Sequence, residues 1–284
     1  MKVGLIDVGG GLRDIFGSGV IDYLIDKDIF IDYLVGISAG SGNIVTYMSK
    51  QSRRNYKSYM KFSKRKEYMS LSNYIKNRNY VDVEYIYNTL ASDTGELPLD
   101  YDTFKKSKSE CLVVVSNAVT GEPEYYTKKD IGRNDYGICA ASSNLPVMNK
   151  PYSYKDILYY DGSITDPIPI EKCYEAKCDK IIIILTRPIN FRKKEKKHKL
   201  LYRKVRKEFP QFTEKLEVRS SLYNKKLDDI IAMKDKNILI ISPEETSGLK
   251  TLTRNYDKMD LLYKEGYEKG KLIEDFIKTK KKGK

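Results

Sequence analysis

The sequence predicts an α/β protein built on a mostly parallel sheet, and three observations carry this prediction. Short apolar runs of strand length recur along the 284 residues and alternate with stretches whose apolar residues repeat at helical spacing. Glycine-rich segments follow the first two apolar runs, as in turns that lead from a strand into a helix. The chain opens on a β-α-β-α unit, which favours a parallel sheet with helices on its faces.

That opening unit occupies the first 48 residues. Residues 2–7 (KVGLID) form an apolar strand that runs into three consecutive glycines, and residues 15–24 continue with helical spacing. A second strand, residues 31–35, leads into the sequence GISAG, and the apolar pattern of residues 44–48 predicts the helix behind it. Residues 53–102 are polar and aromatic, which predicts short helical pieces and a loop near Gly95 and Pro98.

The rest of the chain alternates in the same way. We expect strands or extended segments at residues 111–119, 124–130, 180–186 and 237–242, and helices at residues 136–145, 194–208 and 212–233. No internal repeat is found. The pattern predicts one domain over residues 1–284, with a helical C-terminal portion from about residue 190.

Composition and the N-terminal residues bound the class of protein. Hydrophobic residues make up 40% of the chain and charged residues 32%, which is typical of a globular protein. No apolar run approaches the roughly 20 residues of a membrane span. The first apolar run is broken at Asp7, so it does not resemble the core of a signal peptide, and we expect a cytoplasmic protein.

Cysteine and histidine usage gives no metal site. Cys111, Cys139, Cys173 and Cys178 show no CxxC spacing, and His198 is the only histidine. We therefore expect neither a metal nor an organic cofactor. Free, buried thiols are typical of a reducing compartment, and a redox pair of Cys173 and Cys178 is the alternative interpretation.

The net charge of +13 is concentrated in three basic stretches: residues 50–66, 187–207 and 278–284. Such stretches bind anionic surfaces, of lipid or of nucleic acid, or they are solvated helix faces. In the first stretch, Tyr56, Tyr59 and Met60 share one helical face with basic residues around it. That face predicts peripheral contact with the headgroup region of an anionic membrane, and no nucleic acid is expected.

Ser38 is the first candidate for catalysis. It stands in GISAG, residues 36–40, between an apolar strand and a helix, which is the pattern of a nucleophile elbow. The glycines let the backbone pack closely while the hydroxyl points out of the turn. The same pentapeptide also fits a turn of small residues that carries a solvated serine, so the rest of the sequence must decide.

The glycine loop GGGLRD offers donors for an oxyanion. Gly9, Gly10 and Gly11 precede a helix, so their backbone N–H groups can face a developing negative charge. A dinucleotide fingerprint is the weaker interpretation, because Asp14 stands in place of its third glycine and Asp32 begins the second strand instead of ending it. The Gly-Lys-Ser/Thr of a Walker loop is missing.

The base is the remaining requirement. Ser38, Asp161 and His198 follow the chain order of a hydrolase triad, but His198 lies in a strongly cationic segment and Ser38 follows only two strands. A carboxylate can serve instead if a dry pocket raises its proton affinity. Asp161 in YYDGS fits this role, since the following glycine allows a sharp turn at the end of the sheet. An ordinary Asp-Gly turn is the alternative.

Four motifs in order, GGGLR, GISAG, ASSNLP and DGS…DPIPI, resemble the patatin-like phospholipase family, and in particular its bacterial cytoplasmic branch. With KIIIILTRP and the helical tail, the resemblance covers essentially the whole chain. It implies a three-layer α/β/α fold and favours the elbow interpretation of GISAG. The family's Ser–Asp dyad corresponds to Ser38 as nucleophile and Asp161 as general base.

The resemblance also implies an oxyanion hole from the backbone of Gly9, Gly10 and Gly11, with the N–H of Ala39 as a further donor. Arg13 matches the family's basic position, where it fixes the loop or faces a charged group of the substrate. The sequence departs from the family pattern at three positions: Val8, Asp14 and Ser163. A charged Asp14 beside the loop would oppose the oxyanion.

The sequence therefore predicts a serine acyl hydrolase that cleaves carboxylic esters of lipids through a Ser38–Asp161 dyad and an acyl-enzyme. The expected partner is a lipid ester, and the expected location is the cytoplasm with peripheral contact at the inner membrane face. The alternative is a non-catalytic basic protein that binds anionic membrane or nucleic acid.

Overall fold

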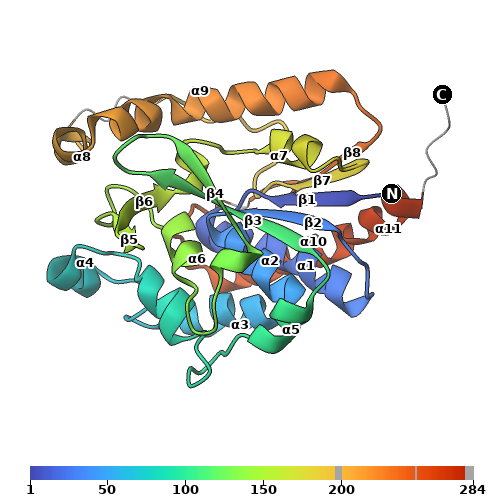
Figure 1. Cartoon of the computed structure of the whole chain (residues 1–284), viewed down its shortest axis with the longest axis horizontal. Coiled ribbons are helices and arrows are strands. Elements are labelled where there is room, and N and C mark those ends of the chain that lie inside the picture. Colours follow the sequence, from blue (N-terminus) through green and yellow to red (C-terminus); the bar gives the residue numbers. More distant parts are fainter. Residues whose placement is uncertain (196–199, 247, 279–284) are drawn as a thin grey trace.

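Eight strands form one sheet between two layers of helices (Figure 1). The computed structural model describes residues 1–195, 200–246 and 248–278. The strands are β1 (Val3–Asp7), β2 (Tyr33–Ile37), β3 (Glu110–Asn117), β4 (Pro123–Thr127), β5 (Tyr152–Tyr154), β6 (Ile157–Asp161), β7 (Lys180–Ile184) and β8 (Ile238–Ile241). The predicted three-layer α/β/α architecture is confirmed.

Pairing runs in the order β5-β6-β3-β2-β1-β7-β8, and β4 also pairs with β3. The parallel part of the sheet consists of five strands in the spatial order β3, β2, β1, β7 and β8. The other three strands, β4, β5 and β6, run antiparallel to their neighbours. Strands β1, β2 and β7 are buried along their whole length, because helices cover both faces. This explains why these strands read as continuous apolar runs.

The helices divide between the two faces of the sheet. Figure 1 shows α7 and α9 on one face, and α1, α2 and α10 on the other. The helices are α1 (Ile15–Asp26), α2 (Ala39–Met48), α3 (Arg54–Met60), α4 (Leu71–Asn77), α5 (Tyr101–Lys106), α6 (Gly137–Ser142), α7 (Ile170–Glu175), α8 (Arg203–Glu208), α9 (Pro210–Met233), α10 (Tyr256–Lys269) and α11 (Lys271–Lys278). A separate hydrophobic cluster fills the space on each face.

Most predicted elements occur within a few residues of their expected bounds, and one helix differs. The expected helix at residues 194–208 is represented by α8 alone, which begins at Arg203. His198 lies outside the described residues, as do residues 279–284 of the basic tail. In the described part of the chain, no helix combines the length and the apolar character needed to cross a membrane.

Candidate active site

Ser38 occupies a sharp turn between β2 and α2. Its backbone has φ 56° and ψ −131°, a conformation that is sparsely populated by residues other than glycine. The turn is compact: a β-carbon at Gly36 would lie 2.7 Å from the Ser41 α-carbon, and one at Gly40 would lie 2.4 Å from the Asp7 carbonyl oxygen. The two glycines of GISAG are thus required by close packing, as the elbow interpretation predicts.

The glycine loop lies directly against this turn. Gly9, Gly10 and Gly11 all have positive φ, and a β-carbon at Gly9 would lie 2.2 Å from the Ile37 carbonyl oxygen. The Gly9 N–H donates to Asp7 Oδ1 at 3.0 Å. By contrast, the N–H groups of Gly10, Gly11 and Ala39 have no acceptor among the described residues. These three N–H groups are therefore available to an oxyanion, and Gly9 contributes its close packing.

The register of β3 brings the ends of β2 and β6 together. Strand β4 occupies one edge of β3 along residues 112–116. On the other edge, Val114 pairs with Ile37 of β2, and the next residue, Val115, pairs with Asp161 of β6. Because a strand has only two edges, β2 and β6 share one of them, and their opposite directions bring their carboxyl ends face to face. The elbow and Asp161 meet at this junction.

Helix α6, which carries the start of the ASSNLP motif, holds this junction in place. Ser142 accepts a hydrogen bond from the Ser38 N–H at 2.9 Å and donates to the Val114 carbonyl at 2.6 Å. The Asn144 carbonyl accepts from the Asp161 N–H at 2.9 Å. One short segment thus binds the backbone of both candidate catalytic residues. The sequence analysis did not assign Ser142 or Asn144 a contact.

Asp161 is almost fully buried, with 1% of its surface exposed. Burial raises the pKa of its carboxyl group, while hydrogen bonds from the side chains of Ser38 and Ser163, and the charge of Lys193, act in the opposite direction. The Ser163 N–H donates to Asp161 Oδ1 at 2.9 Å, so this departure from the family pattern contributes its backbone. The arrangement keeps a carboxylate beside the Ser38 hydroxyl in a largely dry position.

One cation of the basic stretch, Lys193, lies near the buried carboxylate, and further cations lie near Lys193; the sequence alone did not indicate this. Burial and the charges of Arg219, Arg13 and Arg187 lower the pKa of Lys193 to about 8, whereas Asp161 raises it. The Lys193 ammonium lies 4.1 Å from the centre of the Tyr223 ring on α9. The site is therefore electropositive on the side that faces α9.

Asp14 lies in surroundings that disfavour the opposing charge expected from its place in the loop. It is fully buried, and burial, followed by the charge of Asp7, raises its pKa well above the ordinary value. Asn43 donates to Asp7 Oδ2 at 2.8 Å and to Asp14 Oδ2 at 3.1 Å. Asp14 Oδ1 is buried without a hydrogen-bond partner among the described residues. Burial therefore favours the protonated form of Asp14, which would oppose an oxyanion less than the charged carboxylate expected from the sequence.

Arg13 is buried and fixes the loop to a distant segment. Its Nη1 donates to Thr251 Oγ1 at 3.0 Å, and the Thr251 carbonyl accepts from the Leu12 N–H at 2.8 Å. Burial lowers the pKa of Arg13 to about 10. On the other side of the loop, Thr186 donates to the Gly9 carbonyl at 2.6 Å. Thr186 lies two residues after the end of β7, a neighbour of β1, so its position at the sheet edge was a usable signal. Nothing in the sequence indicated Thr251.

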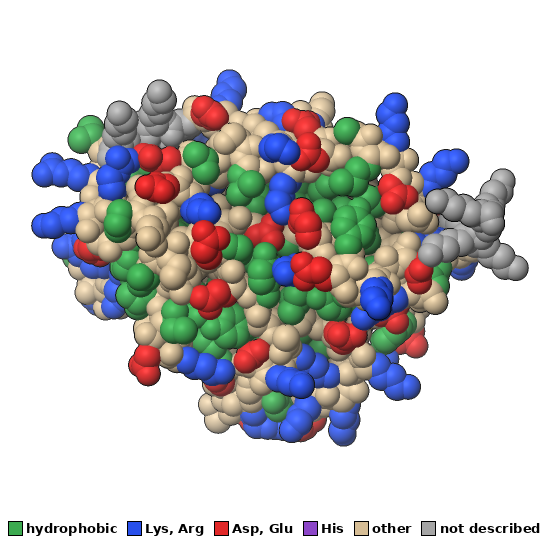
Figure 2. Space-filling view, turned by 45° about the horizontal axis from the view of Figure 1, so that its top comes forward, with side chains coloured by type: hydrophobic (Ala, Val, Ile, Leu, Met, Phe, Trp, Pro, Cys, Tyr) green, Lys and Arg blue, Asp and Glu red, His purple; other side chains and the backbone are tan. Residues whose placement is uncertain are grey.

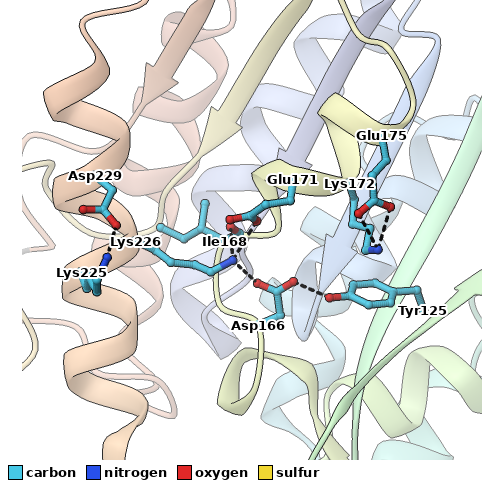
Figure 3. A network of polar contacts seen from close by, with 9 residues as sticks. All are labelled: Tyr125, Asp166, Ile168, Glu171, Lys172, Glu175, Lys225, Lys226 and Asp229. Atoms are coloured by element: carbon cyan, nitrogen blue, oxygen red, sulfur yellow. Dashed lines mark hydrogen bonds and ion pairs between the residues drawn. The ribbon is translucent and has the colours of Figure 1, made fainter.

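Helix α9 is tied to the chain segment that follows Asp161. Lys226 on α9 donates to Asp166 Oδ1 at 2.8 Å and to Glu171 Oε2 at 2.9 Å (Figure 3). Asp166 also accepts from the Tyr125 hydroxyl of β4 at 2.6 Å. Figure 3 shows Asp166 between the two donors, so both of its oxygens are used. The DPIPI motif is thereby held between a strand and a helix that is distant in sequence.

A largely apolar pocket opens beside the elbow. Its lining includes Ser38, Ala39 and Gly11, together with side chains from the segment around α3 and α4 and from the loop after α6: Tyr59, Tyr68, Met69, Val81, Val83, Ile86, Tyr87 and Leu145. The described residues contain no group of three or more His, Cys, Asp or Glu side chains suited to a metal ion. Val8, the third departure from the family pattern, is buried in the cluster under α9.

The fold and the elbow place the chain in the class of three-layer α/β/α proteins with a serine at a strand-to-helix turn. The chain belongs to the patatin-like phospholipase family, whose model matches residues 8–174. A second model, a domain of unknown function called DUF6363, matches residues 209–278 and so covers the whole of α9, β8, α10 and α11.

Two similar proteins complete the comparison. The chain is 26% identical over 193 residues to the uncharacterized protein YjjU of Escherichia coli strain K12, covering 66% of this chain and 52% of that protein. The chain thus spans about half the length of this relative. The crystal structure of VipD from Legionella pneumophila aligns with 96% of this chain and 67% of that chain, at 13% identity and a TM-score of 0.49.

Proposed function

We propose that the chain is a serine acyl hydrolase of the lipase or phospholipase A type, with Ser38 as nucleophile and Asp161 as general base. The proposal rests on one observation, the junction where the carboxyl ends of β2 and β6 meet on one edge of β3. At this junction the Ser38 side chain lies beside the buried Asp161 carboxyl group. A positioned base next to a strained, buried serine is the arrangement that nucleophilic catalysis needs.

The proposed reaction has two steps. Ser38 Oγ attacks the ester carbonyl while Asp161 takes its proton, and Asp161 then returns the proton to the departing alcohol. The acyl-enzyme that remains is hydrolysed by a water molecule from which the same carboxylate takes a proton. The free N–H groups of Gly10, Gly11 and Ala39 stabilise the negative oxygen of both tetrahedral intermediates. These steps use no metal or organic cofactor.

The pocket supports a lipid ester as substrate. The side chains beside Ser38 are mainly aliphatic and aromatic, and such a lining suits an acyl chain. The cations near Asp161 lie on the α9 side of the dyad, where they favour a substrate with an anionic group. We therefore propose acyl glycerolipids that carry a phosphate as the substrate class, in line with the name of the family.

Labelling with a fluorophosphonate probe tests the chemistry directly. We expect the wild-type chain to be labelled and to hydrolyse a short-chain nitrophenyl ester, and Ser38→Ala to lose both properties. Asp161→Asn should lower turnover by about 10²–10⁴, because it removes the proton acceptor. His198→Ala is the matched control and should react like the wild type.

Two outcomes of that experiment would contradict the proposal. Full activity of Ser38→Ala would exclude Ser38 as nucleophile, and a loss in His198→Ala as deep as that in Ser38→Ala would restore a triad. If the folded wild-type chain is not labelled at all, the alternative of a non-catalytic basic protein is favoured instead.

The surface first expected to contact a membrane is occupied by other contacts. Tyr59 is buried, and the Tyr56 hydroxyl donates to Asp260 of α10 at 2.7 Å. Arg54 donates to backbone carbonyls of residues 97 and 98, and Arg65 pairs with Glu96. The aromatic face of residues 50–66 therefore packs on the protein core, and the prediction that it meets lipid headgroups is wrong.

Helix α4 offers a better surface for peripheral contact with lipid. Leu71 and Ile75, one turn apart, are 68% and 74% exposed, and α4 projects from the helical layer in Figure 1. Exposed Lys66, Lys76 and Arg78 lie before and after the pair in the sequence, and no ion pair is found for them within the described residues. The segments before and after α4 line the pocket of Ser38. We propose that α4 rests on an anionic lipid surface beside the pocket mouth.

The other basic stretch does not form a patch of one sign. Arg192 pairs with Asp228, Arg206 with Glu217 and Lys204 with Glu208. Figure 2 shows acidic side chains interspersed with the Lys and Arg side chains on the face that it presents. This mixed charge supports the expectation that nucleic acid is not a partner. The cytoplasmic location stays a prediction.

A further inference from the structure

Cys173 and Cys178 lie together where α7 ends and β7 is about to begin. The Lys177 N–H donates to the Tyr174 carbonyl and the Cys178 N–H donates to the Cys173 carbonyl, both at 2.9 Å, while Lys177 has φ 58°. This is the Schellman ending of a helix, in which the residue after the left-handed position contacts the last helical turn. Here the two residues that meet are both cysteines.

The two sulfur atoms converge on one point of β1. A β-carbon at Gly4 would lie 2.9 Å from Cys178 Sγ and 3.0 Å from Cys173 Sγ, so the two sulfur atoms lie close to each other. The sulfur atoms fill the space that a side chain at Gly4 would take, which explains a glycine inside a buried strand. The closed turn also holds the two α-carbons at short range, and a disulfide needs them about 4.4–6.8 Å apart.

The two thiols differ in exposure and in charge environment. Cys173 is fully buried, and its hydrogen bond with Cys178, together with burial, raises its pKa. Cys178 is half-buried, and the hydrogen bond from Cys173 and the charge of Lys2 lower its pKa against burial and the charges of Asp32 and Glu110. An accessible thiolate beside a buried thiol is the arrangement in which one cysteine attacks and the other resolves.

We propose that Cys178 and Cys173 are a dithiol site that a low-molecular-weight disulfide oxidises to an intramolecular disulfide. The Cys178 thiolate attacks one sulfur of the oxidant, whose S–S bond breaks and releases one thiolate. The Cys173 thiol then gives its proton to solvent and attacks Cys178 Sγ, which breaks the mixed disulfide and releases the second thiolate. Two cysteine thiols are oxidised, one disulfide molecule is reduced to two thiols, and a dithiol reductant reverses the reaction.

The other two cysteines provide an internal reference. Cys111 and Cys139 are buried, and burial raises the pKa of each thiol to about 12. Both face the opposite side of the sheet from α7, in the cluster under α1 and α2. They should stay reduced under conditions that oxidise the dithiol, because the thiol and not the thiolate dominates at neutral pH.

In the test, the folded full chain is exposed to glutathione disulfide at neutral pH. It is then denatured in the presence of an alkylating reagent, and its intact mass is measured. We expect the wild type to lose two alkylatable thiols and to retain no glutathione. Cys173→Ser should retain one glutathione on Cys178, because the resolving thiol is missing. Cys178→Ser should alkylate at all three of its remaining cysteines. Cys139→Ser, a substitution of the same kind at another buried position, should oxidise like the wild type.

Several results would overturn the proposal: a wild type that keeps all four thiols, a wild type that accumulates a stable glutathione adduct, or a Cys173→Ser variant that forms none. Circular dichroism of each variant shows whether it is folded before oxidation. The readout is mass alone, so it stands apart from the proposed hydrolase activity, and a failure of either proposal leaves the other testable.

Discussion

At the scale of single residues, Ser38 is held in an unfavourable backbone conformation by its surroundings. Its N–H donates to Ser142 and its carbonyl accepts from Ser41, while the glycine at position 9 lets the loop pack closely against this turn. A residue in such a region costs about 1–3 kcal/mol and persists only when its neighbours determine it. This unfavourable conformation occurs at the residue whose side chain lies beside the Asp161 carboxyl group. Its position supports the proposed catalytic role of Ser38.

The pH dependence of activity should report the environment of Asp161. Burial raises the pKa of its carboxyl group, and the general base must be ionised, so activity should fall with decreasing pH already above the ordinary value of about 3.9. The Lys193 charge lowers this pKa, so Lys193→Met should move the acidic limb of the kcat/KM profile to higher pH. Lys194→Met, at an exposed neighbour, is the control. An unchanged acidic limb in Lys193→Met would argue against Asp161 as the base.

The glycine loop should be sensitive to a single methyl group. Gly10 has φ 152°, and a β-carbon there would lie 2.3 Å from Thr186 Oγ1; a β-carbon at Gly11 would lie 2.4 Å from the Thr251 carbonyl oxygen. We expect Gly10→Ala and Gly11→Ala to lower turnover by about 10²–10³, as loss of an oxyanion donor does. Gly248 also has positive φ, but a β-carbon there meets no described atom within 4 Å, so Gly248→Ala is the control for backbone strain. Equal turnover in all three variants would show that the loop is only a turn.

At the scale of elements, the segment that carries the base is braced by α9. The Lys226 side chain is 20% exposed and that of Asp166 is 8% exposed, so the pair is largely removed from solvent. Removing one partner of such a contact leaves the other buried without a counter-charge, which costs more than the pair itself contributes. The helical region matched by the domain of unknown function thus has a structural link to the site through Lys226.

Lys226→Met should therefore lower the free energy of unfolding by about 1–3 kcal/mol, measured by urea denaturation. It should also reduce turnover, because Asp166 lies five residues after Asp161 on the same braced segment. Lys225→Met removes only an exposed pair with Asp229, visible beside it in Figure 3, and should change stability by less than about 0.5 kcal/mol. Equal stability of the two variants would show that the contact does not brace the segment.

At the scale of the whole molecule, the exposed pair Leu71 and Ile75 of α4 lies between two chain segments that line the pocket of Ser38. A surface with two exposed aliphatic side chains and three cations that form no ion pair with a described residue suits the boundary between lipid headgroups and acyl chains. Each cation near an anionic membrane contributes about 1 kcal/mol, and salt screens the attraction over about 8 Å. Attachment through α4 would therefore be loose and would depend on salt.

The double variant Leu71→Ser/Ile75→Ser should bind vesicles of anionic phospholipid about tenfold or more weakly, because it removes the apolar contact. Hydrolysis of a water-soluble ester should stay at the wild-type level. Leu261→Ser changes a leucine that is 64% exposed on α10 and serves as the control. Docking through α4 would be rejected if the double variant and the control sedimented equally with these vesicles. It would also be rejected if binding of the wild type did not fall at high salt.

The site was predictable from sequence where it depends on local backbone geometry. Glycines at positions 9–11, 36 and 40 mark turns that no larger residue can form, and the apolar runs before them fix the strands. Ser38 and the loop could therefore be placed at the carboxyl ends of neighbouring strands. Asp161 followed from its own turn and from the order of motifs. The buried face of α3 was not predictable, since an aromatic helical stripe fits a core and a membrane surface equally well.

The sequence by itself determined the order and type of the elements, the elbow and the glycine loop, because these depend on residues that are close in the chain. Only the tertiary structure decided what meets across long separations. The β3 register sets Asp161 beside the elbow, Thr251 reaches Arg13, and Cys173 and Cys178 converge on Gly4. Burial, which follows from packing alone, then raises the pKa of Asp161 and raises that of Asp14 well above its ordinary value. Local patterns carry no information on these contacts, because desolvation and distance arise only when the layers assemble.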